Sequence, residues 1–285
     1  MISGTRYQLT LEINRQAALA REIARGQVQI STTKRIIAPS DDPIAAARVS
    51  DIARSQADAT AWQRNLDLAS ALGARADTVL KSIETAVGRA AELMVSAANG
   101  TLSDENRATV ALELRSISEE LAALKDSKDS RGGALFMTGS ALQIPVAPGF
   151  SIAAVATRET VFENVPTGSG PQDIAAIVAA AADALVEPDP ALRAAAIQQS
   201  LGDVNDAVSH AGTVRGEQGA RGNRIDALLE RLADGGLQLA EERSGLEDTN
   251  IPETVARISA RKISLEAAQA VFARINQNTL FDILR

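Results

Sequence analysis

Residues 62 to 97 carry an apolar residue or a glycine at steps that alternate between four and three. The positions are Trp62, Leu66, Ala69, Gly73, Ala76, Leu80, Ile83, Val87, Ala90, Met94 and Ala97. The residues between them are largely polar, for example Gln63, Asp67 and Lys81. An apolar repeat of about 3.5 residues over this length is typical of a long helix in a left-handed coiled coil. We therefore predict an extended helical protein rather than a compact enzyme.

Composition agrees with this interpretation and excludes several classes of function. Apolar residues make up 45% of the 285 residues but aromatic residues only 2%, which fits thin helical bundles better than a large globular core. The net charge of −7 does not suggest nucleic acid, which needs a basic face. The chain has no cysteine, so it is compatible with export. We find no secretory signal and no apolar run near the ~20 residues of a membrane span.

Start and stop signals predict where the helices begin and end. Asp42 is placed to cap a long helix with Pro43 at its first position, and Asn99-Gly100 would end that helix. Ser103 begins the next helix, whose seam is Val110, Leu114, Ile117, Leu121 and Leu124. A short connection between two long helices implies an antiparallel hairpin.

Both ends of the chain are predicted to be helical and to need a partner. From about residue 9 to 30, one face carries Leu9, Ile13, Ala17, Ala20 and Ala24. From Pro252 onward, one face carries Val255, Ile258, Leu265, Ala268, Phe272 and Ile275. Helices of this length are marginal alone, so these faces must meet each other or another subunit. We expect the terminal segments to order on assembly.

The fold class we predict is mainly α, with nested long helices and a small, partly β outer lobe. Residues 1–42 and 252–285 form a terminal coiled-coil domain, and residues 43–131 and 190–251 form a helical bundle. Residues 132–189 form the outer lobe, because glycines and prolines interrupt them repeatedly and 150–165 could supply one or two short strands.

No constellation in the chain predicts catalysis, a cofactor or a metal. Asp41 and Asp42 lie side by side before a helix, where caps are far more frequent than acid–base pairs. His210 is the single histidine, so a histidine triad or a multi-histidine site has no second member, and zinc has no cysteine ligand. No phosphate-binding glycine motif lies between a strand and a helix.

Four glycines lie on one face of a predicted helix, at positions 212, 216, 219 and 222. They would cost about 4 kcal/mol relative to alanine. Either the helix is frayed there, or a neighbouring helix approaches its backbone closely. Arg215, Arg221 and Arg224 flank the glycines, and salt bridges between subunits fit them better than a phosphate site does.

The segment from Thr32 to Ala46, TTKRIIAPSDDPIAA, resembles a signature of the bacterial flagellin superfamily. The proline after the two aspartates is similar to the hook–filament junction members, whereas flagellins more often read SDDAAG. Residues 99–107, 133–139, 219–224 and 279–284 also resemble those junction members. Thr33 departs from the pattern, because the family usually has glycine there. The outer lobe is also shorter than in the junction members, and flagellin therefore stays an alternative.

The resemblance implies a structural protein of the bacterial flagellum, exported through the flagellar type III apparatus without a cleaved signal. Its implied partners are further copies of itself in a ring, the first hook-associated protein, flagellin and a cytoplasmic export chaperone. A minor filament-forming flagellin is the alternative, and an enzyme on a helical scaffold is a remote third. We take ten residues as subunit-contact candidates: Lys34, Arg35, Asp41, Asp42, Arg215, Arg221, Arg224, Phe272, Leu280 and Phe281.

Overall fold

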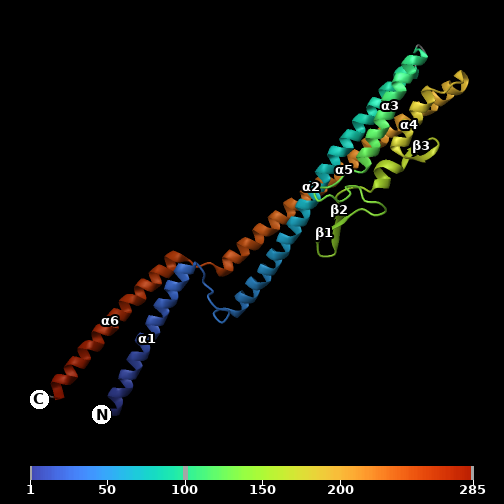
Figure 1. Ribbon diagram of the computed structural model, residues 1–285. Coiled ribbons are helices and arrows are strands. Elements are labelled where there is room, and N and C mark those ends of the chain that lie inside the picture. Colours follow the sequence, from blue (N-terminus) through green and yellow to red (C-terminus); the bar gives the residue numbers. More distant parts are fainter. Residues whose placement is uncertain (1, 99–101, 284–285) are drawn as a thin grey trace. The chain divides into compact units, whose positions relative to one another are not determined.

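The computed structural model describes residues 2–98 and 102–283, and for residues 2–6, 8 and 275–283 it describes the backbone alone. Long helices dominate the described residues (Figure 1). They are α1 (Ile2–Thr32), α2 (Pro43–Ala98), α3 (Asp104–Lys125), α4 (Ile174–Leu185), α5 (Pro190–Glu247) and α6 (Ile251–Ile283). The mainly α fold class predicted from the sequence, with long helices and a small, partly β lobe, is confirmed.

The chain divides into two compact units. The terminal unit comprises residues 1–58 and 235–285, and the central unit comprises residues 59–234. The helices α2 and α5 contribute to both units. In the described segments, no helix combines the length and the apolar character that crossing a bilayer requires.

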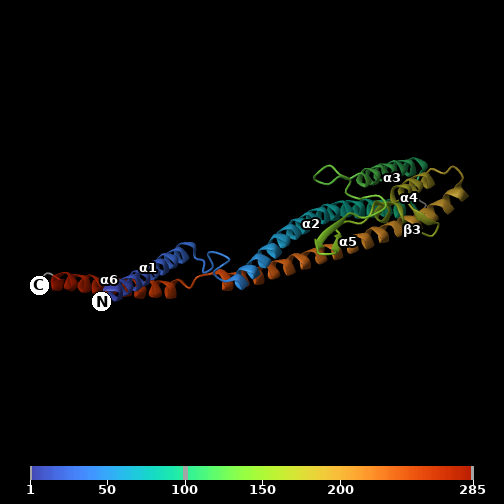
Figure 2. The same ribbon diagram turned by 90° about the horizontal axis from the view of Figure 1, so that it is seen from below.

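The core of the central unit lies along α2. The predicted seam of α2 is confirmed, because its members are buried except for Trp62, which is half-buried at the start of the unit. A second row of α2 residues, spaced seven residues apart, is also buried and was not predicted: Leu72, Val79, Ala86 and Leu93. Two buried rows let α2 pack against more than one neighbour. In both ribbon views α2 lies beside α5, and α3 lies beside α4 (Figures 1 and 2).

Helices α2 and α3 run in opposite directions, as the predicted antiparallel hairpin requires (Figure 1). Arg89 of α2 pairs with Glu113 of α3 at 2.8 Å. The α3 seam is buried at Leu114, Ile117 and Leu121. Asn106 donates its backbone N–H to the Ser103 hydroxyl, which confirms the predicted helix start. The predicted helix end at Asn99-Gly100 lies outside the described residues.

Two further caps decide where α4 and α5 begin. The Asp173 carboxylate accepts the backbone N–H groups of Ala175 and Ala176. The Asp189 carboxylate accepts those of Ala191 and Leu192. Helix α5 therefore begins at Pro190, because a proline is favoured at the first helical position.

The lobe of the central unit is built from two antiparallel hairpins and one π-helical turn. Strand β1 (Gln143–Ala147) pairs with β2 (Phe150–Ala153), and β3 (Val165–Thr167) pairs with β4 (Gly170–Gln172). The expected strand segment 150–165 contains β2 but then forms the turn η1 (Glu159–Glu163). That turn buries both Val161 and Phe162, whereas neighbouring residues of a strand point to opposite faces.

Polar side chains of the long helices hold the lobe in place. Asn65 of α2 donates to the Pro145 carbonyl of β1 at 2.8 Å. The buried Gln218 of α5 donates to the Ala154 carbonyl at 2.8 Å. Inside the lobe, the Phe136 and Phe162 rings meet edge to face at 5.2 Å.

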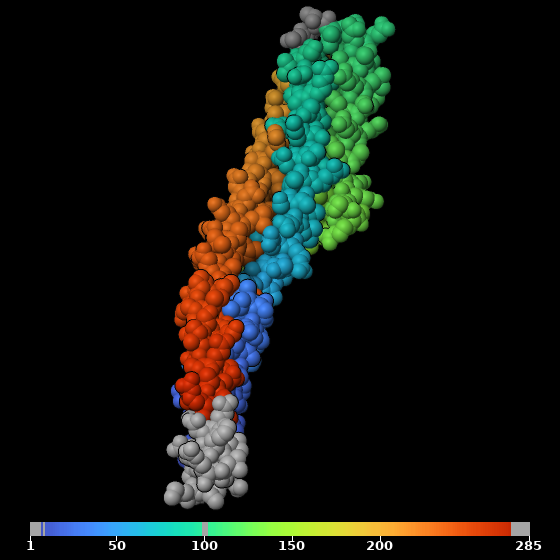
Figure 3. All heavy atoms as spheres, turned by 90° about the vertical axis from the view of Figure 1, so that its left-hand side faces the viewer, coloured from blue at the N-terminus to red at the C-terminus, as the bar shows by residue number. Residues whose placement is uncertain are grey.

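In the terminal unit, α1 lies along α6 in the opposite direction (Figures 1 and 3). The α1 residues that α6 covers recur at steps of four and three: Glu12, Gln16, Leu19, Ile23, Gly26 and Ile30. The corresponding α6 residues are Thr254, Ile258, Arg261, Leu265, Ala268 and Phe272. The pair is therefore a short antiparallel coiled coil.

The face predicted for α1 does not meet α6, which excludes the first of the two partners that the sequence left open for it. Leu9, Ile13, Ala17, Ala20 and Ala24 are all exposed, because α6 packs on the adjacent, more polar stripe. For α6 the prediction was largely right, but Val255 is exposed and Thr254 is buried in its place. Ile275 lies outside the described side chains.

Candidate functional site

The face of α1 that points away from α6 carries an exposed apolar stripe. Leu9 is 38% exposed and Ile13 is 51% exposed, and Val28 continues the same stripe at 41%. The stripe towards α6 begins instead with Glu12 and Gln16. Helix α1 thus packs its more polar stripe against α6 and leaves its apolar stripe exposed. Exposed apolar surface of this kind is typical of protein–protein interaction sites.

Gly26 marks the closest approach of α1 to α6. A Cβ built on Gly26 would lie 2.7 Å from Cγ1 of Ile258, which is closer than real side chains pack. Gly26 is fully buried, as is Thr254 beside it. The sequence analysis assigned Gly26 no role in packing. A lone glycine within a helical pattern usually has a packing reason, and that signal could have identified it.

The corner between α1 and α2 is organised by Asp41. Its Oδ2 atom accepts the backbone N–H groups of Ile37 and Ala38, both at 3.1 Å, and Oδ1 pairs with Arg25 at 2.5 Å. The hydrogen bonds from Ala38 and Ile37, followed by the charge of Arg25, lower the pKa of Asp41. Asp41 therefore stays ionised and holds the turn, and it has no proton to exchange near neutral pH.

Asp42 is the N-cap of α2, as predicted. Its Oδ1 atom accepts the backbone N–H of Ala45 at 3.0 Å, and its carboxylate pairs with Arg35 at 3.4 Å. Lys34 pairs with Glu247 at 2.7 Å. The structure thus brings four candidates, from Lys34 to Asp42, into one corner, and Glu247 is the partner that sequence reasoning missed.

The three arginines of α5 have partners within the chain. Arg215 contacts Glu84 at 2.6 Å and Asp77 at 3.4 Å, so it ties α5 to α2. The hydrogen bond and charge of Glu84, with Asp77, raise the pKa of Arg215. Arg221 pairs with Glu217 at 3.2 Å. The Arg224 guanidinium lies 5.3 Å from the ring centre of Phe150 in the lobe.

Helix α5 runs unbroken through the four glycines, so the frayed-helix interpretation was wrong. Within the chain, no neighbouring helix approaches the four glycines closely either, because a Cβ at any of them would meet no described atom within 4 Å. Gly212, Gly216 and Gly219 are exposed. Phe272, another candidate, is half-buried against α1, whereas the side chains of Leu280 and Phe281 lie outside the description.

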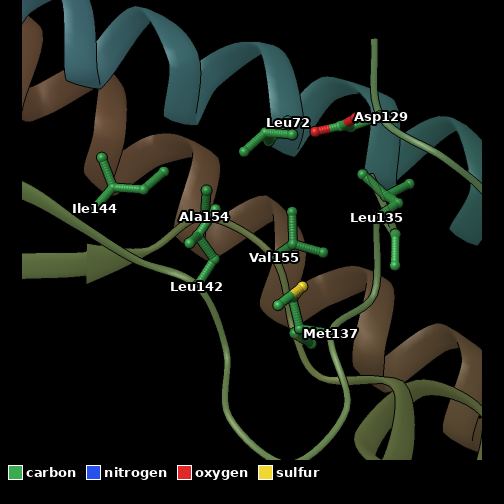
Figure 4. Close-up of a pocket in the computed structure, with 10 residues that line it drawn as sticks. Leu72, Asp129, Leu135, Met137, Leu142, Ile144, Ala154 and Val155 are labelled. Carbon is green, nitrogen blue, oxygen red and sulfur yellow. The ribbon is translucent and has the colours of Figure 1, made fainter. Parts of the chain in front are cut away.

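The described residues offer little for small-molecule chemistry. Among them, no group of three or more His, Asp or Glu side chains is arranged to hold a metal. A cavity of about 30 Å³ lies between α2 and the lobe, lined by Leu72, Leu135, Met137, Leu142 and Val155 among others (Figure 4). This volume is suited to water-sized molecules, whereas pockets for drug-sized ligands measure about 300–1,000 Å³.

The comparisons with known proteins follow the same architecture. The bacterial flagellin N-terminal helical region matches residues 8–139, and the bacterial flagellin C-terminal helical region matches residues 201–284. Together these two matches cover most of the chain. The chain belongs to the bacterial flagellin family, a class of structural proteins of the flagellum.

Within this family, similarity extends over nearly the whole chain. Flagellar hook-associated protein 3 of Escherichia coli strain K12 is 26% identical over 90% of both chains. A flagellin of Listeria monocytogenes is 20% identical over 90% of this chain and 88% of its own. The flagellar junction protein FlgL of Legionella pneumophila has a similar fold, with a TM-score of 0.59 at 15% identity over 70% of this chain and all of its own.

Proposed function

We propose that this protein is the junction subunit that links the flagellar hook structure to the filament. The observation that carries the proposal is the similarity to hook-associated protein 3 over 90% of both chains, at higher identity than to the flagellin of comparable coverage. In this role the protein builds and connects, and the corner at Asp41 and Asp42 contributes geometry rather than catalysis.

The surface of the terminal unit supports an assembling role. Among the described residues, nothing covers the apolar stripe of α1, and the stripe of α1 that α6 covers contains Glu12 and Gln16. Such a pair is weak alone and gains stability when a neighbour covers its apolar side. We propose that further copies in a ring provide this cover, with residues 1–42 and 252–285 forming the inner layer.

The proposal includes partners on both sides of the ring. The first hook-associated protein lies on the hook side and flagellin on the filament side. A cytoplasmic chaperone holds the chain before export through the type III apparatus, without a cleaved signal. Residues 43–131 and 190–251 then form the middle layer, and residues 132–189 face outward. The ten contact candidates, among them Lys34, Arg215 and Phe272, are proposed to act between subunits where their partners within the chain leave them accessible.

Deletion of the gene tests the junction role directly. Cells should keep hooks, lose filaments and release flagellin monomer into the medium. The alternative role, a filament-forming flagellin, predicts that the purified chain polymerises alone into long filaments. Such filaments, or a deletion strain with intact filaments, would reject the junction proposal.

A matched pair of variants tests the α1 surface. Ile13→Asp places a charge on the apolar stripe, and Asn14→Asp places the same charge one residue further along the exposed side of the helix. Because both positions are exposed, the monomers should melt alike. Motility of the complemented deletion strain should fall for Ile13→Asp alone. Equal motility of the two strains would show that this stripe is not a subunit contact.

A further inference from the structure

The two connections of the terminal unit, from α1 to α2 and from α5 to α6, are joined to each other. Lys34 and Asp248 form an isolated antiparallel bridge. The Arg35 N–H donates to the Glu247 carbonyl at 2.6 Å, and the Thr249 N–H donates to the Thr33 carbonyl at 2.8 Å. We call this pairing of residues 33–35 with residues 246–249 the clasp.

Side chains reinforce the clasp from both connections. Glu247 accepts from Lys34 at 2.7 Å and from Arg243 at 2.8 Å. Arg35 donates to the Leu246 carbonyl at 2.9 Å, and its own carbonyl accepts from Gln29 of α1 at 2.9 Å. The clasp therefore connects α1, α5 and the start of α6 through one set of hydrogen bonds.

The backbone of the clasp is strained at one residue. Thr33 has a φ of 58°, and it is the one non-glycine residue with a positive φ among those described. A β-branched side chain in the left-handed region is a true outlier, because its Cβ crowds the backbone. Such a conformation persists where the surrounding contacts impose it, and here the contacts are those of the clasp.

Burial between α1 and α6 is concentrated at the clasp end. The fully buried residues of the pair, Gly26 and Thr254, both lie within eight residues of the clasp. Further along, the covered residues are half-buried and include Gln16 and Glu12. Contacts of that kind stabilise a short helix pair only weakly.

We propose that the clasp is a latch that controls the pairing of the two terminal helices. With the clasp closed, the end of α1 and the start of α6 are held side by side. Pairing of the rest of the two helices then costs little further conformational entropy. With the clasp open, α1 and α6 separate as independent, marginal helices. The strained backbone of Thr33 makes the closed clasp less stable than it would be with a glycine at that position. It is a property of the single chain and does not depend on the flagellar role.

Amide hydrogen exchange on the purified full chain tests the latch with two opposite variants. Thr33→Gly removes the crowding and keeps every backbone bond of the clasp, so exchange at Arg35 and Thr249 should slow about fivefold. Glu247→Gln removes the charge that Lys34 and Arg243 hold and should speed the same amides severalfold. Glu241→Gln, at an exposed glutamate six residues earlier on α5, is the control and should change neither.

The decisive readout lies outside the clasp. If the latch controls pairing, amides in residues 23–30 of α1 and 254–261 of α6 must slow in Thr33→Gly and speed in Glu247→Gln, while α3 in the central unit stays unchanged. Clasp amides that change without the helix amides would overturn the proposal. It would equally fail if Thr33→Gly left the clasp unchanged or if the shift spread to α3.

Discussion

The seam of α2 gives the sharpest test of the coiled-coil interpretation, because an inward and an outward residue are neighbours in sequence. Leu80 is 2% exposed and lies in the core of the central unit, whereas Lys81 next to it is exposed. Substituting aspartate at each position adds the same side chain to the same helical turn. Any difference in stability then reports burial and not helix propensity.

The expected loss at Leu80 follows from its burial. Removing a buried leucine side chain costs about 2–5 kcal/mol through lost transfer energy and the cavity that is left. Aspartate adds an unpaired buried charge, so Leu80→Asp should lose on the order of 5 kcal/mol. For a domain of this size, that lowers the Tm by about 10–20 °C.

Scanning calorimetry and far-ultraviolet circular dichroism measure this difference, and Leu80→Ala supplies an intermediate point. Lys81→Asp should stay within about 0.5 kcal/mol of the parent chain, as surface changes usually do. A common Tm for Leu80→Asp and Lys81→Asp would refute the assignment of the seam.

The remaining predictions concern the corner and the clasp. Asp42→Ala should cost about 1 kcal/mol in chemical denaturation through loss of the N-cap, and Asp42→Asn should be milder because its amide oxygen still accepts the Ala45 N–H. Lys34 and then Arg243 lower the pKa of Glu247 below its ordinary value of 4.5. The stabilisation from Glu247 should therefore be complete above that pH and should be lost as the pH falls through the lowered value. The protection of the Arg35 amide, measured as its exchange rate relative to the intrinsic rate at the same pH, should fall on acidification in the parent chain. Glu247→Gln should flatten that profile; an unchanged profile would exclude Glu247 as its source.

Much of the helical framework could be predicted from the sequence because local signals and packing agree there. The seam from Leu66 to Ala97 is apolar at every step, and caps such as Asp42 and Ser103 satisfy backbone groups within a few residues. Such features depend on contacts close in the chain. The predicted boundaries of α2 therefore match the observed ones at the start.

The contacts that the sequence did not predict have one physical cause. An apolar pattern shows which face of a helix is buried, but not which other segment packs against that face. The apolar stripe with Leu9 and Ile13 was a sound amphipathic signal, yet α6 occupies the stripe beside it, where Gly26 permits close contact. The glycines near Gly216 suggested close packing but face open space. Glu247 was missed because its partner Lys34 lies more than two hundred residues away.

Trp62 gives the central unit a spectroscopic signal that the terminal unit lacks. It is the single tryptophan of the chain and lies half-buried in the central unit, whereas the single tyrosine, Tyr7, lies exposed on α1 in the terminal unit. Tryptophan fluorescence therefore follows the melting of the central unit, and circular dichroism follows the helices of both units. The absence of native cysteine leaves every thiol label free to be placed at will, for instance at the clasp. Trp62 thus reports the central unit, and a single introduced cysteine can report the terminal unit.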